Sequence, residues 1–241
     1  MKSIILFEPM NRLRLEDIFT IGDRYNIVTK YKEIPVRVNL RLNWLDEEGR
    51  LLGFDWGRTH LKVAFSTLDP VYVELSPEEF AKTQVFSNLG KELVLMLENF
   101  VEPPEFVKRR YVRVEPDENK PVKVVISVSG ISAETQARDI SETGVGVALD
   151  RESHRELIDL LEGISEDLKA GGPDRDFTIR ILLPSGEEAV GKGRLRNVIG
   201  LGRDVYVRLG FEVSFPKKEI TKIKRYVLER QKEIIKSLRM V

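Results

Sequence analysis

A short basic segment, Lys108-Arg109-Arg110-Tyr111-Val112-Arg113, carries the residues with the clearest binding chemistry in this chain of 241 residues. Four of these six residues are cationic, although the formal net charge of the chain is zero. Arg109 and Arg113 are four positions apart, and each guanidinium presents a planar fork of donors. That fork matches the paired oxygens of phosphate and the O6/N7 edge of guanine. The segment predicts an anion- and guanine-binding site, and the alternative is a solvated, charged linker.

A second polar motif follows in Asp139-Ile140-Ser141-Glu142-Thr143-Gly144. Asp139 can accept hydrogen bonds from N–H groups, and glycine supplies positive φ at no steric cost. An ordinary Asx turn between two strands would use the same residue types. We interpret the basic segment and this motif as two halves of one site.

The elements around the two motifs are mostly strands, so the predicted fold class is all-β dominated. Apolar and polar residues alternate through 36–42 and again through 122–128, which is typical of strands with one wet face. The continuous apolar run 93–97 is ambiguous between strand and helix. We expect two small antiparallel β-barrels, the second of about six strands. Two helices accompany the second barrel, one inserted at 151–170 and one beginning near Pro216.

Glu102-Pro103-Pro104-Glu105 marks a domain boundary, because prolines fix φ and make a segment semi-rigid. The expected organisation is a first domain at 1–101, a linker at 102–113 that carries both arginines, and a second domain at 114–241. The polar, aromatic stretch Asp55–His60 in the first domain is interpreted as a loop rather than a site.

The amino-acid composition argues against several classes of function. There are no cysteines and only two histidines, so we expect no disulfide, no metal and no cofactor. No nucleophile–base pair is apparent, so we expect a binding protein and not an enzyme, without catalytic residues. Balanced charge argues against nucleic acid as a partner. No apolar stretch is long enough to span a membrane, and the expected location is the cytoplasm.

With both motifs in view, Arg109-x-x-x-Arg113 followed by Asp139-x-Ser141-x-x-Gly144 resembles the signature of PilZ domains, bacterial receptors for cyclic di-guanylate (c-di-GMP). Either motif alone is unspecific, whereas both in register within one barrel are specific. The resemblance covers residues 108 to about 235. The two-domain layout is similar to the flagellar brake branch of that family, which implies that the first barrel is a split barrel that precedes the nucleotide-binding barrel. Neighbouring segments also match the family pattern: Val122-Lys123-Val124, Gly144-Val145-Gly146-Val147, Arg208-Leu209-Gly210-Phe211-Glu212 and the terminal stretch 223–231.

The resemblance implies roles for six residues. Arg109 and Arg113 would clamp guanine edges and phosphates from the linker, and Arg110 would add local positive charge. Asp139 would accept from a guanine N–H edge and Ser141 would meet a phosphate or base. Gly144 would let the turn approach the ligand.

The resemblance further implies a sensor whose linker closes on c-di-GMP and reorients the two domains toward a protein partner, such as motility, adhesion or envelope machinery. The alternatives are a PilZ-type adaptor that does not bind nucleotide, a barrel that binds single-stranded nucleic acid, and a flavin-using split-barrel enzyme in the first half. The chain departs from the family at 151–170, where a helix replaces a short loop. Its apolar face must pack on the barrel, on the first domain or on a second copy, and a homodimer is one prediction.

Overall fold

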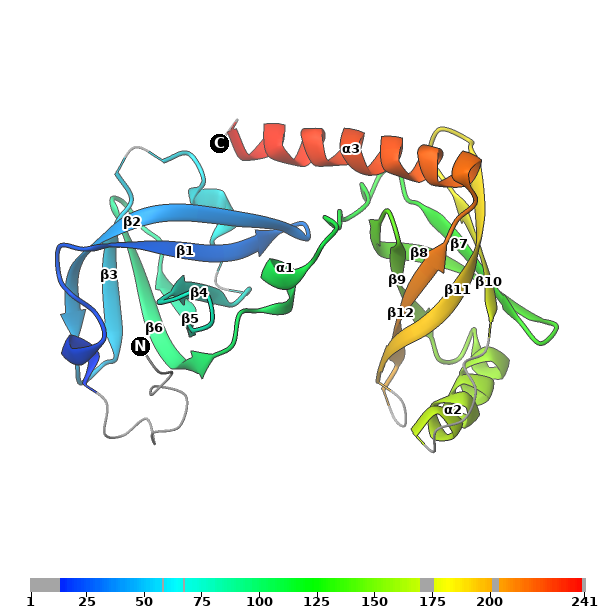
Figure 1. Ribbon diagram of the computed structural model, residues 1–241, viewed down its shortest axis with the longest axis horizontal. Helices are drawn as coiled ribbons and strands as arrows, with labels where there is room; N and C mark the ends of the chain where they lie inside the picture. The colour runs from blue at the N-terminus through cyan, green and yellow to red at the C-terminus, as the bar shows by residue number, and fades with distance from the viewer. Residues whose placement is uncertain (1–13, 58, 67, 170–175, 201–203, 240–241) are drawn as a thin grey trace. The chain divides into compact units, whose positions relative to one another are not determined.

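The protein contains two closed, six-stranded antiparallel barrels among the residues that the computed structural model describes, which are 14–57, 59–66, 68–169, 176–200 and 204–239. Figure 1 shows the strands of each barrel, and the prediction of an all-β-dominated, two-barrel chain is confirmed. The chain divides into two compact units. The first contains residues up to Arg110 together with those from Ile234 onward, and the second is Tyr111–Glu233.

The first barrel has the strand order β1-β2-β3-β6-β5-β4, and β4 pairs back with β1. Side chains on β2 alternate strictly between buried and exposed over its first ten residues, as expected for a strand that separates core from water. The ambiguous apolar run 93–97 lies within a strand, β6. The strands are β1 (Arg24–Tyr31), β2 (Ile34–Asp46), β3 (Leu51–Asp55), β4 (Val71–Glu74), β5 (Phe80–Ser87) and β6 (Glu92–Val101), with short 3-10 turns η3 (Leu15–Asp17) and η4 (Lys62–Ala64).

The core of the first barrel is built from large side chains that are almost completely removed from water. Phe54 and Leu95 are fully buried, and Trp56 is 1% exposed. The Trp56 indole N–H donates to Asn88 Oδ1 at 2.9 Å, which satisfies the one polar atom of that side chain. Trp56 therefore anchors the loop that follows β3 to the barrel interior.

The second barrel has the order β10-β11-β12-β9-β8-β7 and closes through pairing of β10 with β7. Its core includes an edge-on contact between Phe177 and Phe211, whose ring centroids are 5.1 Å apart. The strands are β7 (Lys123–Val128), β8 (Ile131–Ser141), β9 (Gly144–Asp150), β10 (Phe177–Leu182), β11 (Glu188–Ile199) and β12 (Tyr206–Ser214).

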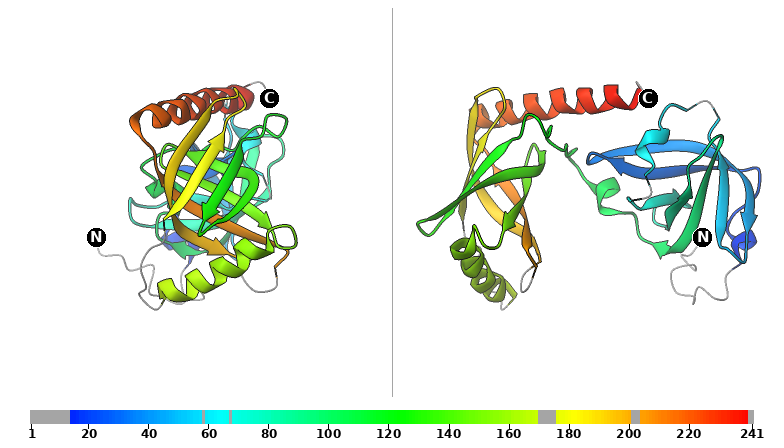
Figure 2. Two further views of the ribbon diagram at one scale, coloured as in Figure 1. Left: turned by 90° about the vertical axis from the view of Figure 1, so that its right-hand side faces the viewer. Right: turned by 180° about the vertical axis from the view of Figure 1, so that it is seen from behind.

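The inserted helix, α2 (Arg155–Lys169), lies against its own barrel (Figures 1 and 2) and contacts β8. Of the apolar face predicted from the sequence, Leu157, Leu161 and Ile164 are at most 2% exposed, so this part of the face is covered within the second unit. The helix begins later than residue 151, because the Ser153 hydroxyl donates to Asp150 Oδ1 at 2.8 Å in a preceding turn. Residue 170, the predicted end, lies outside the described residues.

A glycine in the middle of α2 allows a test of the helix by substitution. Gly163 is exposed, and an added Cβ would meet no atom within 4 Å. Gly163→Ala is expected to raise the free energy of unfolding by about 0.5–1 kcal/mol, because alanine loses less conformational entropy in a helix. Urea unfolding measures this change.

Gly191→Ala on β11 is the matched control, and it is expected to destabilise. Its Cβ would lie 2.8 Å from the backbone oxygen of Ser214, which cannot move aside cheaply. An unfolding midpoint that falls in Gly163→Ala would contradict the helix geometry described for α2.

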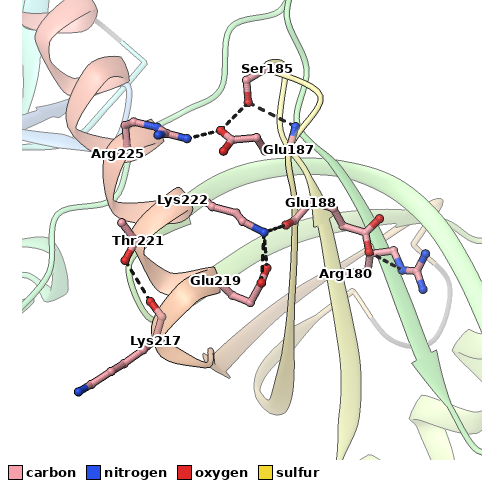
Figure 3. Close-up of polar contacts among 9 residues, drawn as sticks. All are labelled: Arg180, Ser185, Glu187, Glu188, Lys217, Glu219, Thr221, Lys222 and Arg225. Carbon is pink, nitrogen blue, oxygen red and sulfur yellow. Dashed lines mark hydrogen bonds and ion pairs between the residues drawn. The ribbon is translucent and has the colours of Figure 1, made fainter.

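The terminal helix, α3 (Lys217–Arg239), begins directly after Pro216, as the sequence predicts. Figure 3 shows how its first turns attach to the β10–β11 turn. Lys222 Nζ donates to the backbone oxygen of Glu188 at 2.7 Å, and Arg225 pairs with Glu187. Ile223, the next residue after Lys222, is fully buried. No helix formed by the described residues is both long and apolar enough to cross a membrane.

Candidate functional site

The end of the basic segment is joined to the Asp139 motif by backbone pairing. Val114 and Ile140 exchange two hydrogen bonds, of 2.9 and 3.0 Å, and both side chains are fully buried. Arg113 and Asp139 flank this bridge, and Arg113 Nη1 donates to Asp139 Oδ1 at 3.1 Å. The two motifs predicted to form one site therefore meet in the second unit at these two side chains.

Asp139 is positioned by a β-bulge and by a glycine on the neighbouring strand. The register of β8 against β9 shifts between Ala137 and Asp139, and a bulge of this kind redirects the side chain that follows it. Gly146 lies directly opposite Asp139, and a Cβ there would approach Asp139 Oδ2 to 2.2 Å. Gly146 thus provides the space in which the carboxylate lies. The site predicted from the sequence did not include Gly146, although a glycine inside a strand is a signal of close approach.

Ser141 and Gly144 pair across the two-residue turn between β8 and β9. Ser141 is only 4% exposed, and its hydroxyl donates to the Gly144 carbonyl at 3.4 Å. Gly144 is not among the positive-φ residues, so the expectation of a left-handed conformation there is wrong. Its Cβ would instead lie 2.9 Å from the backbone oxygen of Phe211, so glycine is needed for close packing against β12.

Arg109 makes its polar contact within the first unit. It follows the short helix α1 (Glu105–Lys108), and its Nη1 donates to Glu33 Oε2 at 2.8 Å. Arg110 is the next residue and the last of that unit before Ile234. The structure therefore brings together Arg113, Asp139, Ser141 and Gly144 in the second unit, and it assigns Arg109 and Arg110 to the first.

Glu33 is held ready for Arg109 by an unusual turn. Lys32 and Glu33 form the two-residue loop between β1 and β2, with φ values of 49° and 68°. Such a loop matches the twist of a hairpin, but each non-glycine residue with positive φ costs on the order of 1 kcal/mol. Burial acts to raise the pKa of Glu33, yet hydrogen bonds from Lys30 and Arg109 outweigh it and hold that pKa below its ordinary value. The carboxylate is therefore ionised at neutral pH.

Arg230 on α3 immobilises the chain just after Arg113, a role that the sequence did not indicate. Its side chain is 8% exposed, its Nε donates to the backbone oxygen of Glu115 at 2.9 Å, and its Nη1 contacts Asp117 at 3.1 Å. The same nitrogen contacts Glu233 at 2.9 Å. A buried guanidinium with several acceptors is a strong local constraint.

Tyr226 lies one helical turn before Arg230, and its burial is expected to make the free energy of unfolding depend on pH. Its hydroxyl is buried without a hydrogen-bond partner among the described residues, and burial raises the pKa of Tyr226 to about 12, against the opposing charge of Arg230. Between its ordinary value of 10.0 and about 12 the unfolded chain loses this proton first. The free energy of unfolding is therefore expected to fall with rising pH over that interval.

Urea unfolding at a series of alkaline pH values, with Tyr226→Phe as the comparison, measures this contribution. The substitution is expected to flatten the alkaline decline while leaving stability at neutral pH unchanged or higher, because it removes an unpaired hydroxyl. Identical alkaline profiles for the two proteins would refute the assignment.

The arrangement at Arg113 and Asp139 offers donors and acceptors side by side. The side chains are 38% and 20% exposed, so both are accessible to a ligand from water. Among the residues that the structure describes, no cluster of histidine, cysteine and acidic side chains could hold a metal ion. The site is thus suited to recognising a ligand that carries both an anionic group and N–H donors.

Comparisons with known proteins give three solved structures of similar chain length. The chain is 13% identical to Klebsiella pneumoniae MrkH in its complex with c-di-GMP, covering 89% of this chain and 90% of that one with a TM-score of 0.44. It is 12% identical to Escherichia coli YcgR in complex with c-di-GMP, covering 92% and 90%, with a TM-score of 0.42. It is 14% identical to the Bacillus subtilis inhibitor of motility MotI/DgrA, covering 89% and 99%, with a TM-score of 0.40.

No protein-family model matches the chain. A curated protein of Aquifex aeolicus (strain VF5), described as uncharacterized, is 42% identical over 230 residues, which span 95% of this chain and 96% of that protein. Identity at this level over nearly the whole of both chains establishes that the two chains share a common ancestor. The chain therefore belongs to the same protein family as this Aquifex aeolicus protein.

Proposed function

We propose that the protein is a PilZ-type receptor for c-di-GMP and not an enzyme. The observation that supports the proposal is the contact between Arg113 and Asp139, 3.1 Å long, which links the last residue of the Arg-x-x-x-Arg motif to the first residue of the Asp-x-Ser-x-x-Gly motif. Both motifs match the family signature, and the backbone bridge at Val114 and Ile140 holds them together. A chance occurrence of two motifs would not require them to meet in space.

Binding of c-di-GMP would replace the contact between Arg113 and Asp139 by contacts of each side chain with the ligand. The Arg113 guanidinium is paired with the Asp139 carboxylate. A guanine edge carries N–H donors that Asp139 can accept, while the O6/N7 edge and the phosphates accept from Arg113. Partly exposed ion pairs are worth about 0–1 kcal/mol, so a ligand that satisfies both groups can replace the pair at little cost.

Arg109 would join the ligand by leaving Glu33. That pair is also partly exposed, with 25% and 18% of the two side chains accessible. We propose that c-di-GMP draws Arg109 and Arg110 toward Arg113, orders the linker 102–113 and so reorients domains 1–101 and 114–241. A disorder-to-order change in a linker is a common way to couple ligand binding to domain motion.

The linker step is tested by attaching a donor and an acceptor dye to the two domains and measuring energy transfer with and without c-di-GMP. The transfer efficiency should change on saturation in the unmodified chain and stay constant in Arg109→Ala. If the protein binds c-di-GMP but the transfer efficiency does not change, binding is supported and the proposed reorientation of the domains is contradicted.

Binding itself is tested by calorimetric titration of the full chain. We expect saturable binding of c-di-GMP, weaker binding of cyclic di-adenylate because its bases lack the O6 acceptor and the N1–H and N2–H donors of guanine, and weaker binding of GMP because it supplies one base. No heat with c-di-GMP, or equal affinity for the two cyclic dinucleotides, would overturn the proposal.

The proposed function includes a cytoplasmic location and a protein partner in motility, adhesion or envelope machinery.

We also propose a homodimer through 151–170, formed by another face of this helix than the apolar one that the sequence suggested. Leu157 and Leu161 are buried against the barrel, so a second copy would have to use the outward face of α2. Light scattering on the unmodified chain would show twice the monomer mass if that surface self-associates.

A further inference from the structure

The first barrel carries a basic concavity that the proposed c-di-GMP site does not use. It has a volume of about 540 Å³ and is lined by three arginines from β1 and β2, namely Arg24, Arg37 and Arg41. We call this surface the arginine basin. Asp55, Gly57 and Thr59, from the stretch that the sequence marks as polar and aromatic, complete its wall. Arginines outnumber carboxylates three to one among the lining residues.

Two of these arginines are placed where they repel one another. Arg24 and Arg41 are direct cross-strand partners on β1 and β2. Like charges in this position typically destabilise a sheet by about 0.2–1 kcal/mol. Within the part of the chain that the structure describes, neither guanidinium forms an ion pair with a carboxylate. This repulsion brings the folded protein no stability, which suggests that something outside the chain offsets it.

Neutral acceptors hold both guanidinium groups in place. Arg24 Nη1 donates to the backbone oxygen of Asn39 at 3.0 Å, and Arg41 Nε donates to the backbone oxygen of Gly22 at 3.2 Å. Carbonyl oxygens fix the direction of a guanidinium without cancelling its charge. The two forks are therefore oriented in advance, which lowers the entropic cost of binding an anion.

The other charged side chains at the basin leave it positive. Arg37 contacts Glu74 at 3.5 Å, so its charge is partly offset. Asp55 lies opposite Arg41 on β3, yet its carboxylate accepts the Gly57 backbone N–H at 2.9 Å and makes no ion pair with Arg41. Asp55 thereby shapes the loop wall, and among the residues that the structure describes no carboxylate pairs with Arg24 or Arg41.

We infer that the arginine basin binds a small ligand carrying two or more phosphate groups. Arginine forks match phosphate oxygens in pairs, and the volume lies in the range of about 300–1,000 Å³ typical of small-molecule sites. A long nucleic acid would call for a wide basic surface, whereas the chain as a whole has zero formal net charge. The inference concerns residues of β1, β2 and the loop after β3, so it stands whether or not c-di-GMP binds at Arg113.

The test uses tripolyphosphate as the probe and the full chain as the receptor. Nuclear magnetic resonance of arginine Nε–Hε groups and backbone amides should show saturable shifts at Arg24, Arg41 and the amides of Gly57 and Thr59. Arg24→Gln combined with Arg41→Gln should weaken binding about tenfold or more, whereas Arg37→Gln should weaken it less because Glu74 already offsets that charge.

Arg180→Gln on the second barrel is the matched control, since this exposed arginine pairs with Glu188 at 3.4 Å and lies outside the basin. The double variant should retain c-di-GMP affinity and, with the repulsion removed, unfold at an equal or higher urea concentration. Unchanged tripolyphosphate affinity in the double variant, or equal shifts at Arg180 and at the basin, would overturn the inference. So would an oligonucleotide that binds the basin more tightly than tripolyphosphate does.

Discussion

Arg113→Ala is expected to abolish measurable binding of c-di-GMP while both barrels remain folded. Arg113 is the cation that the structure places in contact with Asp139, and its side chain is partly exposed, so truncation leaves no cavity in the core. Losing a charge-assisted hydrogen bond costs about 1.5–3 kcal/mol, and a guanidinium that grips with two such bonds accounts for a loss of about 100-fold or more. Calorimetry measures the affinity, and circular dichroism with urea unfolding checks the fold.

Two further variants sharpen the interpretation of Arg113. Arg113→Lys keeps the charge but loses the planar fork, and it should bind far more weakly than the unmodified protein. Arg180→Ala removes an exposed, ion-paired arginine elsewhere on the second barrel and should bind normally. If Arg113→Ala retained full affinity, Arg113 would not belong to the site, whatever Arg109→Ala shows.

Gly146→Ala is expected to have the second largest effect, through Asp139. The added methyl group would lie 2.2 Å from Asp139 Oδ2, so the carboxylate must move away from its place beside Arg113. The clash involves the end of a side chain and not the backbone, so the strand can persist with a modest loss of stability. We expect c-di-GMP affinity to fall about tenfold or more, the cost of one misplaced charged acceptor.

A double-mutant cycle separates this effect from general damage to β9. If Gly146→Ala acts by displacing Asp139, then adding it to Asp139→Ala should cause little further loss of affinity. Gly163→Ala, the exposed helix substitution, should leave affinity unchanged and controls for glycine replacement as such. Fully additive losses in the cycle would mean that Gly146 serves the ligand directly or the fold in general.

Sequence patterns alone predicted the two barrels and the candidate motifs. Alternation of apolar and polar residues, as on β2, reports directly which face of a strand is buried, and this local signal predicted both barrels. It could not classify the short apolar run in β6, because a fully apolar segment has no period. The left-handed glycine expected at Gly144 was wrong, since the demand there comes from Phe211 on another strand and not from the turn.

Only the tertiary structure decided which side chains meet. Arg113 pairs with Asp139 26 residues later, and Arg109 with Glu33 76 residues earlier. The opposition of Arg24 and Arg41, and the space that Gly146 leaves for a carboxylate, follow from strand register. A single sequence records the preference of each residue for its own backbone, whereas register and closure of a barrel are set by packing across many strands at once. The sequence thus determined two barrels and a pair of candidate motifs, and packing between distant strands determined the geometry of the candidate site.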